Sequence, residues 1–149
     1  MNRGYSAIGL FYPKNDVNVA GVLRACSVYQ SSMLVTCGKR YKKHSADTSV
    51  YWKHMPFIQN ATDLRDYIPY DCVPVAVELV TDAQSLVDYV HPQRAFYVFG
   101  PEDGTLGHQV TDWCRDTVYV PGSHCMNLAA TVNVVLYDRL SKQLRLKDE

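Results

Sequence analysis

The chain has 149 residues, and its 15 basic and 15 acidic side chains give a formal net charge of zero, so no global field favours binding to nucleic acid. A chain of this length can bury an ordinary core, and we expect a single domain over residues 1–149. The five cysteines are odd in number and form no Cys-x-x-Cys pair, which argues against a disulfide framework or a zinc site and favours a reducing cytoplasm. We expect no signal peptide, because the first residues lack an apolar core, and no membrane span, because no apolar run reaches about 18 residues.

The first predicted element is a buried strand over residues 5–12, which leads into a turn at Pro13. A helix is expected next, because its apolar residues have the i, i+3, i+4, i+7 spacing of a core-facing stripe: Val19, Val22, Leu23 and Cys26. Asn18 or Asp16 is the expected N-cap. Gly21 costs this helix about 1 kcal/mol relative to alanine, which close approach of another backbone would explain. A second short strand is predicted over residues 33–37.

Residues 38–60 show no convincing periodicity, and loops of this length are usually functional or disordered. Basic side chains alternate here with aromatic ones, and the basic set includes Lys39, Arg40, Lys42 and Lys43. Lysine and arginine neutralise phosphates while aromatic rings stack on splayed bases, which is how proteins hold single-stranded RNA. The segment is therefore a candidate RNA-binding surface. The alternative is a solvated loop whose aromatic rings tuck onto the core.

The rest of the chain alternates between helical and extended patterns. We expect a short helix over residues 62–67, a strand over 72–80, a helix over 83–89, a strand over 95–99, a short helix over 107–114, a strand over 117–120 and a final helix over 127–146. Strands separated by helical segments favour an open, mostly parallel sheet with helices on both faces, which is an α/β fold.

Two of these strands run into loops that contain glycine and proline. The first loop begins with Gly100-Pro101, and the second begins with Pro121-Gly122 and ends at Asn127, before the final helix. A strand end, a loop with free backbone amides and a helix N-terminus together offer hydrogen-bond donors to a small polar ligand. Glycine lets the backbone approach such a ligand closely. A strand followed by a capped helix is the alternative interpretation of the second stretch.

Three stretches together resemble one family. They are Asn18 and Arg24 in the first helix, Phe-Gly-Pro-Glu at residues 99–102, and Met-Asn-Leu at residues 126–128. In their order, spacing and strand-to-loop contexts they resemble the signature motifs of the SpoU-TrmH group of SPOUT methyltransferases, over nearly the whole chain. The resemblance implies a SPOUT-like α/β fold with a C-terminal trefoil knot, in which the C-terminal segment threads through an earlier loop.

The resemblance implies transfer of a methyl group from S-adenosylmethionine to a ribose 2′-hydroxyl of RNA, without a metal. The chain is similar to the minimal members that act on tRNA, and rRNA is the alternative substrate. Many relatives have serine where this chain has Cys125, so a hydroxyl hydrogen bond there would be weakened or lost, while backbone contacts would survive. The implied cofactor-binding residues are Val77, Gly100, Pro101, Glu102, Val120, Cys125, Met126 and Asn127.

The implied catalytic residues are Arg24, Asn18, Glu102 and Asn127. Arg24 is expected to contact the target phosphate and to assist removal of the hydroxyl proton, although a free guanidinium does not act as a base by itself. A structural salt bridge is its alternative role. Asn18 would orient Arg24 or accept from the substrate, or else cap its helix. Glu102 would bond backbone amides of the knot loops or fix Arg24, or else serve as a turn carboxylate.

The final helix is the expected interface of a homodimer. Its apolar arc includes Val134 and Leu144 beside the main stripe and is wider than one sheet face requires. The family pairs through this helix, and the resemblance implies an arginine site that is completed near the subunit boundary.

Two other classes of function compete with an RNA-modifying enzyme. A non-catalytic RNA-binding module that kept the cofactor fold is disfavoured, because the motif residues Asn18, Arg24, Glu102 and Asn127 are all present. A nucleotide-binding oxidoreductase is disfavoured, because no Gly-x-Gly-x-x-Gly follows the first strand.

Overall fold

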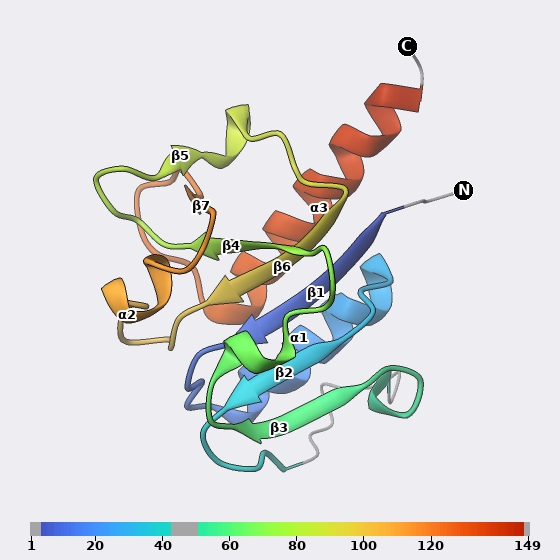
Figure 1. Ribbon diagram of the computed structural model, residues 1–149, viewed down its shortest axis with the longest axis vertical. Coiled ribbons are helices and arrows are strands. Elements are labelled where there is room, and N and C mark those ends of the chain that lie inside the picture. The colour runs from blue at the N-terminus through green and yellow to red at the C-terminus, as the bar shows by residue number, and fades with distance from the viewer. Residues whose placement is uncertain (1–3, 43–50, 148–149) are drawn as a thin grey trace.

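A computed structural model describes residues 4–42 and 51–147, which form an α/β fold (Figure 1). Within these residues one sheet has the strand order β3-β2-β1-β6-β4-β7-β5, and its strand pairings are parallel. The strands are β1 (Tyr5–Leu10), β2 (Leu34–Cys37), β3 (Phe57–Ala61), β4 (Val73–Val77), β5 (Gln84–Ser85), β6 (Arg94–Phe99) and β7 (Asp116–Tyr119). The α-helices are α1 (Asp16–Tyr29), α2 (His108–Thr111) and α3 (Leu128–Lys147), and the 3₁₀ helices are η1 (Tyr51–Lys53), η2 (Leu64–Tyr67) and η3 (Leu86–Asp88).

The sheet separates two hydrophobic cores. On one face, α1 and α3 lie side by side and bury residues such as Val22 and Val132 against the strands (Figure 1). On the other face, strand residues such as Phe96 pack with Leu64 of η2 and with Val110 of α2. The predicted parallel α/β sheet is confirmed. Both long helices cover the same face, however, and the other face is covered by short helical segments. No helix in the two described ranges is long and apolar enough to cross a bilayer.

Two elements differ from the prediction. Residues 83–89, predicted as a helix, form the short strand β5 and the single turn η3. The pairing of β5 with β7, in which Gln84 lies opposite Val118, outweighs the local helical pattern. Residues 57–61 fall in the segment predicted to be a long loop, yet they form the edge strand β3 beside β2. Most of β3 is partly exposed, so no alternation of apolar and polar residues marks it in the sequence.

The start of α1 also differs from the prediction. Its N-cap is Asn15, whose Oδ1 accepts a hydrogen bond from the amide of Val17 at 2.8 Å. The predicted caps, Asn18 and Asp16, both lie inside the first turn, so that prediction is wrong. Asn15 has the extended backbone that an N-cap requires, with φ −114° and ψ 123°. The predicted core-facing stripe is confirmed, because each of its four residues is buried: Val19, Val22, Leu23 and Cys26.

Gly21 lies at a close contact between α1 and α3. A Cβ atom on Gly21 would lie 2.7 Å from the Cβ of Ala129, so the approach predicted for this glycine is to a side chain of α3. We expect Gly21→Ala to lower the free energy of unfolding by about 1–2 kcal/mol, because overpacking outweighs the gain in helix propensity. Adding Ala129→Gly removes the clash, so urea denaturation should find the double variant more stable than Gly21→Ala alone. Equal or lower stability of the double variant would contradict this contact.

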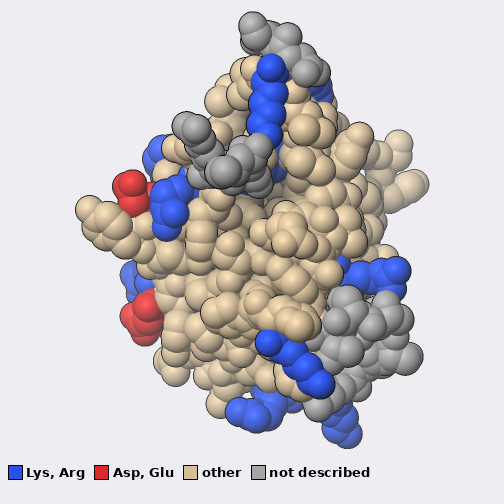
Figure 2. Space-filling view, turned by 90° about the vertical axis from the view of Figure 1, so that its right-hand side faces the viewer, with Lys and Arg blue, Asp and Glu red and all other residues tan. Residues whose placement is uncertain are grey.

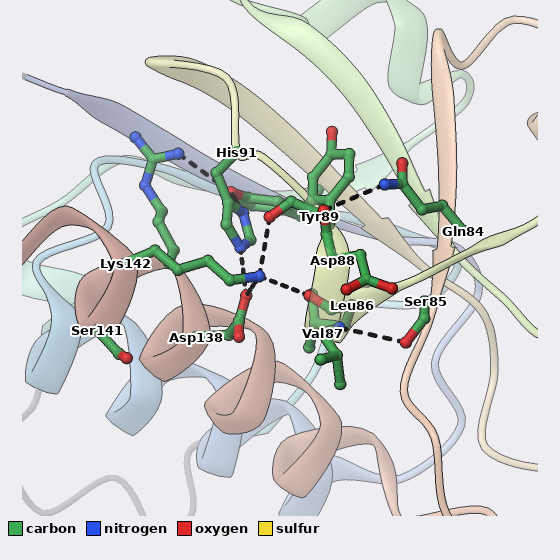
Figure 3. Close-up of polar contacts among 12 residues, drawn as sticks. Gln84, Ser85, Leu86, Val87, Asp88, Tyr89, His91, Asp138, Ser141 and Lys142 are labelled. Carbon is green, nitrogen blue, oxygen red and sulfur yellow. Dashed lines mark hydrogen bonds and ion pairs between the residues drawn. The ribbon is translucent and has the colours of Figure 1, made fainter. Parts of the chain in front are cut away.

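β7 lies between β4 and β5 in the sheet, so residues 78–83, which connect β4 to β5, pass around β7. The continuation of this segment is tied to α3 by a polar network (Figure 3). Lys142 donates to the backbone oxygens of Leu86 and Tyr89 at 2.6 and 2.8 Å, and it pairs with Asp138 at 2.8 Å. These contacts fix residues 86–89 against the last helix. The knot implied by the family resemblance is compatible with this arrangement and stays a prediction.

His91 is the titratable centre of this network (Figure 3). Its Nδ1 lies 2.7 Å from the Tyr97 hydroxyl, and its Nε2 lies 2.7 Å from Oδ2 of Asp138. Burial lowers the pKa of His91 below its usual value of 6.5, although the Asp138 carboxylate opposes this effect.

Because the folded-state pKa of His91 is lowered, the unfolded chain takes up the proton first as the pH falls. The stability that neutral His91 contributes is therefore present above the unfolded pKa and is lost as the pH drops through the folded one. We expect the urea midpoint to fall between pH 7 and pH 5, and to fall less in His91→Gln. Equal pH dependence of the two proteins would assign the effect to other groups.

Candidate active site

A cavity of about 320 Å³ opens at the carboxyl ends of β4, β6 and β7, three neighbouring strands. Its walls are residues 77–79 at the end of β4, residues 99–102 and 104 at the end of β6, residues 119–126 at the end of β7, and Leu128 and Thr131 of α3. Ligands of open α/β sheets bind in the crevice outside the carboxyl ends of the strands. The volume lies at the lower end of the range of small-molecule pockets, about 300–1,000 Å³.

The cavity brings together residues from separate parts of the chain that the family resemblance assigns to one cofactor site. Seven of the eight line it: Val77, Gly100, Pro101, Glu102, Val120, Cys125 and Met126. The eighth, Asn127, is not among the lining residues. Its Oδ1 accepts a hydrogen bond from the amide of Ala130 at 2.8 Å, so Asn127 caps the last helix, as the alternative interpretation of this stretch has it.

The types of residue that line the cavity are compatible with S-adenosylmethionine. Gly100 is closely packed, because a Cβ there would lie 3.2 Å from the amide nitrogen of Leu106. The absence of a side chain lets this loop lie close against residue 106 at the edge of the cavity. Apolar residues such as Val120 and Leu128 line the cavity and suit an adenine ring, and residues 120–126, which precede α3, line it as well. In the described part of the chain, no three His, Cys, Asp or Glu side chains are placed to hold a metal ion.

Glu102 connects the cavity to the start of α1. Its Oε1 accepts a hydrogen bond from the amide of Lys14 at 3.0 Å, and its Oε2 accepts one from the amide of Asn15 at 2.8 Å. An exposed ion pair between Lys14 and Asp103, at 2.8 Å, joins the same two segments. The amides at a helix N-terminus carry partial positive charge that favours a carboxylate. Glu102 therefore bonds backbone amides, as predicted, but those that precede α1 rather than those of the knot loops.

Arg24 and Asn18 lie on α1 and do not line the cavity described above. Arg24 is exposed and Asn18 is partly buried. At about 1.5 Å per residue, Arg24 lies about 12 Å along the helix axis from Asp16, the residue nearest to the Glu102 contacts. Within one chain, Glu102 thus lines the cavity and Arg24 lies outside it.

Glu78 lines the cavity although the sequence analysis does not select it. Its backbone amide donates to the carbonyl of Val118 at 2.9 Å. Its Oε1 accepts from the amide of Leu79 at 3.1 Å, and its Oε2 accepts from the amide of Leu106 at 2.9 Å. The available signal is its position, since a carboxylate that directly follows a buried strand stands where ligands of α/β sheets bind.

The predicted RNA-binding segment keeps its charge but not its stacking rings. Lys39, Arg40 and Lys42 are exposed after β2, whereas Lys43 lies outside the described residues. Tyr41 is buried, and Tyr51 and Trp52 pack against the core, so the alternative interpretation is right for these rings. Figure 2 shows Lys and Arg spread over one face of the molecule, with acidic side chains at one margin.

The SpoU rRNA Methylase family model matches residues 6–137 of the chain. A search of curated protein sequences finds no match. The chain shares its fold with the SpoU methyltransferase AviRb from Streptomyces viridochromogenes, with a TM-score of 0.81 and 15% identity over 95% of this chain, and it spans 60% of the length of AviRb. AviRb has also been solved in complex with AdoMet, with a TM-score of 0.79 and 15% identity over 97% of this chain and 63% of that one.

Two further solved structures share the fold. The A. aeolicus TrmH/SpoU tRNA modifying enzyme has a TM-score of 0.84 and 13% identity over 99% of this chain and 78% of that one. A structure described as giving insights into the 2-OH methylation of C/U34 on tRNA has a TM-score of 0.77 and 18% identity over 95% of this chain and 98% of that one. The TM-scores establish the common fold, and at these identities the likeness shows the fold alone, while the family model covers most of the chain. The chain therefore belongs to the SpoU rRNA methylase family.

Proposed function

We propose that the protein is an S-adenosylmethionine-dependent methyltransferase that modifies a ribose 2′-hydroxyl of RNA, with tRNA as the preferred substrate. The observation that carries this proposal is the cavity at the ends of β4, β6 and β7, lined by seven of the residues that the family resemblance assigns to the cofactor. The AviRb structure with AdoMet supports the cofactor. The similar structure concerned with 2-OH methylation on tRNA supports the substrate, and the rRNA in the family's description makes rRNA the second candidate.

When bound, S-adenosylmethionine supplies an electrophilic methyl group on a sulfonium centre. The part played by this chain is mainly placement, because holding the reacting atoms in line can contribute up to about 7–11 kcal/mol. Val77, Gly100, Pro101, Val120, Cys125 and Met126 line the space that would hold the cofactor. Glu102 keeps the loop after β6 attached to the start of α1, and Asn127 keeps the loop after β7 attached to α3.

Arg24 has the electrostatic role in this proposal. A guanidinium pairs with phosphate through a planar fork of N–H donors. On the exposed side of α1, Arg24 binds the phosphate beside the target ribose and stabilises negative charge as the hydroxyl loses its proton. Asn18, six residues or about one and two-thirds turns earlier on α1, orients the same part of the substrate.

We further propose that the protein acts as a homodimer. The exposed apolar side chains of α3 include Tyr137, which is 60% exposed, and Leu144, which is 50% exposed. A two-fold dimer would cover these side chains with the same helix of a second copy. Because Arg24 does not line the cavity of its own chain, the second copy also offers a cavity that Arg24 can serve.

The reaction is tested with purified protein, methyl-labelled S-adenosylmethionine, and either total tRNA or total rRNA. We expect label in tRNA, in dinucleotides that survive alkaline hydrolysis, because alkali cleaves RNA through the free 2′-hydroxyl. Label released in mononucleotides would indicate base methylation and would overturn the ribose assignment. Label in rRNA alone would overturn the tRNA preference and leave the chemistry standing.

The basic segment gives a separate prediction about RNA binding. Changing Lys39, Arg40 and Lys42 to Gln should weaken RNA binding and reduce the slope of log K against log salt by about 2, since each single-strand phosphate contact contributes about 0.7. Affinity for S-adenosylhomocysteine should stay unchanged. The matched control removes the same charge from exposed sites elsewhere, Arg65, Arg115 and Arg145. Equal salt slopes for the two triple variants would contradict a specific role of this segment.

A further inference from the structure

Glu78 is one of two carboxylates that line the cavity, and the hydrogen bonds of the two differ. Glu102 is directed to the start of α1, where its two oxygens together accept three hydrogen bonds from the amides of Lys14 and Asn15. Glu78 accepts one amide on each oxygen, from Leu79 and Leu106. The Glu78 carboxylate is thus held by two amides, one on each oxygen, and Glu78 is one of the residues that line the cavity.

An ionised carboxylate accepts hydrogen bonds at about four lone-pair sites. With one amide on each oxygen, Glu78 retains acceptor capacity on both oxygens. Two acceptors side by side match two donors side by side, and the cis-diol of a ribose presents that arrangement. A single ammonium group would use this pair less well, because its donors radiate from one nitrogen.

The position of Glu78 favours the same ligand group. It directly follows β4, and its backbone amide is bonded to Val118 of the neighbouring β7, so the carboxylate stands at the ends of two adjacent parallel strands. In doubly wound α/β folds a carboxylate near the strand ends accepts a hydrogen bond from the ribose of a bound dinucleotide. The fixed rotamer also lowers the entropy that binding would otherwise cost.

We propose that Glu78 accepts hydrogen bonds from the ribose hydroxyls of the cofactor's adenosyl group and so determines where the adenosyl half lies in the cavity. This inference rests on the proposed function, since it concerns the same cavity and cofactor. It assigns Glu78 to the binding of the cofactor and gives it no part in the transfer of the methyl group.

The test is calorimetric and does not depend on catalysis. S-adenosylhomocysteine and its 2′,3′-dideoxy analogue are titrated into the wild-type protein, Glu78→Gln and Glu102→Gln. The wild-type protein should prefer the diol ligand by about ten- to a hundredfold, the range for hydrogen bonds to a charged group. Glu78→Gln should lose most of this preference. Glu102→Gln, the matched control, should weaken both ligands by the same factor and keep the preference.

The ratio of the two affinities separates ligand contact from structural support. If Glu78 serves only to hold the amide of Leu106, or if it binds the ammonium of the amino-acid part, Glu78→Gln weakens both ligands equally and the inference is overturned. A wild-type protein that binds both ligands with equal affinity overturns the inference alone. A folded wild-type protein that binds neither ligand overturns the proposed function as well.

Discussion

Gly100→Trp is expected to reduce the affinity for S-adenosylhomocysteine by at least about a hundredfold, which corresponds to about 2.8 kcal/mol. Gly100 borders the cavity on one side and residues 105 and 106 on the other. An indole at this position would therefore occupy either the space of the loop or the space of the ligand. Displacing Leu106 would also break its hydrogen bond to Glu78. Calorimetry measures the affinity, and circular dichroism with urea unfolding checks that the variant is folded.

A comparison of Gly100→Ala with Gly100→Trp tests whether the loss of affinity grows with the size of the side chain. A Cβ on Gly100 lies 3.2 Å from the amide of Leu106, a contact that a shift of a few tenths of an ångström relieves. Gly100→Ala should therefore lose about tenfold or less, and Gly100→Trp much more. A folded Gly100→Trp that binds the ligand as tightly as the wild type would show that the cofactor lies elsewhere.

Arg24→Ala is expected to lower kcat by about a hundredfold or more, within the range of groups that assist proton transfer, and to leave the affinity for S-adenosylhomocysteine unchanged. The two measurements separate because Arg24 does not line the cavity. Single-turnover assays with RNA give the rate of methyl transfer. Arg24→Lys keeps the charge without the planar fork and should recover part of the rate. An unchanged rate in Arg24→Ala would remove it from the reaction.

Mixing two inactive variants tests whether Arg24 serves the cavity of the partner subunit. Arg24→Ala and Gly100→Trp are unfolded and refolded together so that mixed dimers form. In a mixed dimer with an arginine acting in trans, one site combines an intact Arg24 with an intact cavity, and random pairing yields about a quarter of wild-type activity. If Arg24 acts on its own chain, every site stays broken and mixing restores nothing. A protein that methylates RNA as a monomer would remove the premise.

The elements predicted best from the sequence are those whose own residues show the apolar pattern of a helix or a buried strand. The apolar stripe of α1 and the buried runs of β1 and β6 needed no knowledge of a partner. The prediction for the short strand β5 was wrong, because its two residues form a strand only by pairing with Val118 and Tyr119. Each partner lies 34 positions further along the chain. The prediction of the N-cap of α1 was wrong because Asn15, Asp16 and Asn18 are all suitable residue types close together, and only the backbone geometry decides between them.

The same distinction holds for the candidate site. The glycine-containing loops after β6 and β7 are visible in the sequence, and parallel strands place them at one edge of the sheet. Glu78 was missed because a glutamate after a strand is ordinary until the amide of Leu106 is seen to hold it. The contact between Glu102 and the start of α1 joins residues 87 positions apart, as that of the Asn15 amide shows, and no local pattern encodes it.

The place of β5 in the sheet has a consequence for the order in which the chain can fold during synthesis. β5 pairs with β7 and with no other strand of the described residues, so residues 84 and 85 stay without a partner until residues 116–119 have been made. The lysine that holds residues 86–89 comes later still, at position 142. Contacts between distant parts of a chain form slowly, because the loop between them must close first. The lining of the cavity includes Leu128 and Thr131 of α3, so the cavity is complete only after β7 and the start of α3 have both been made.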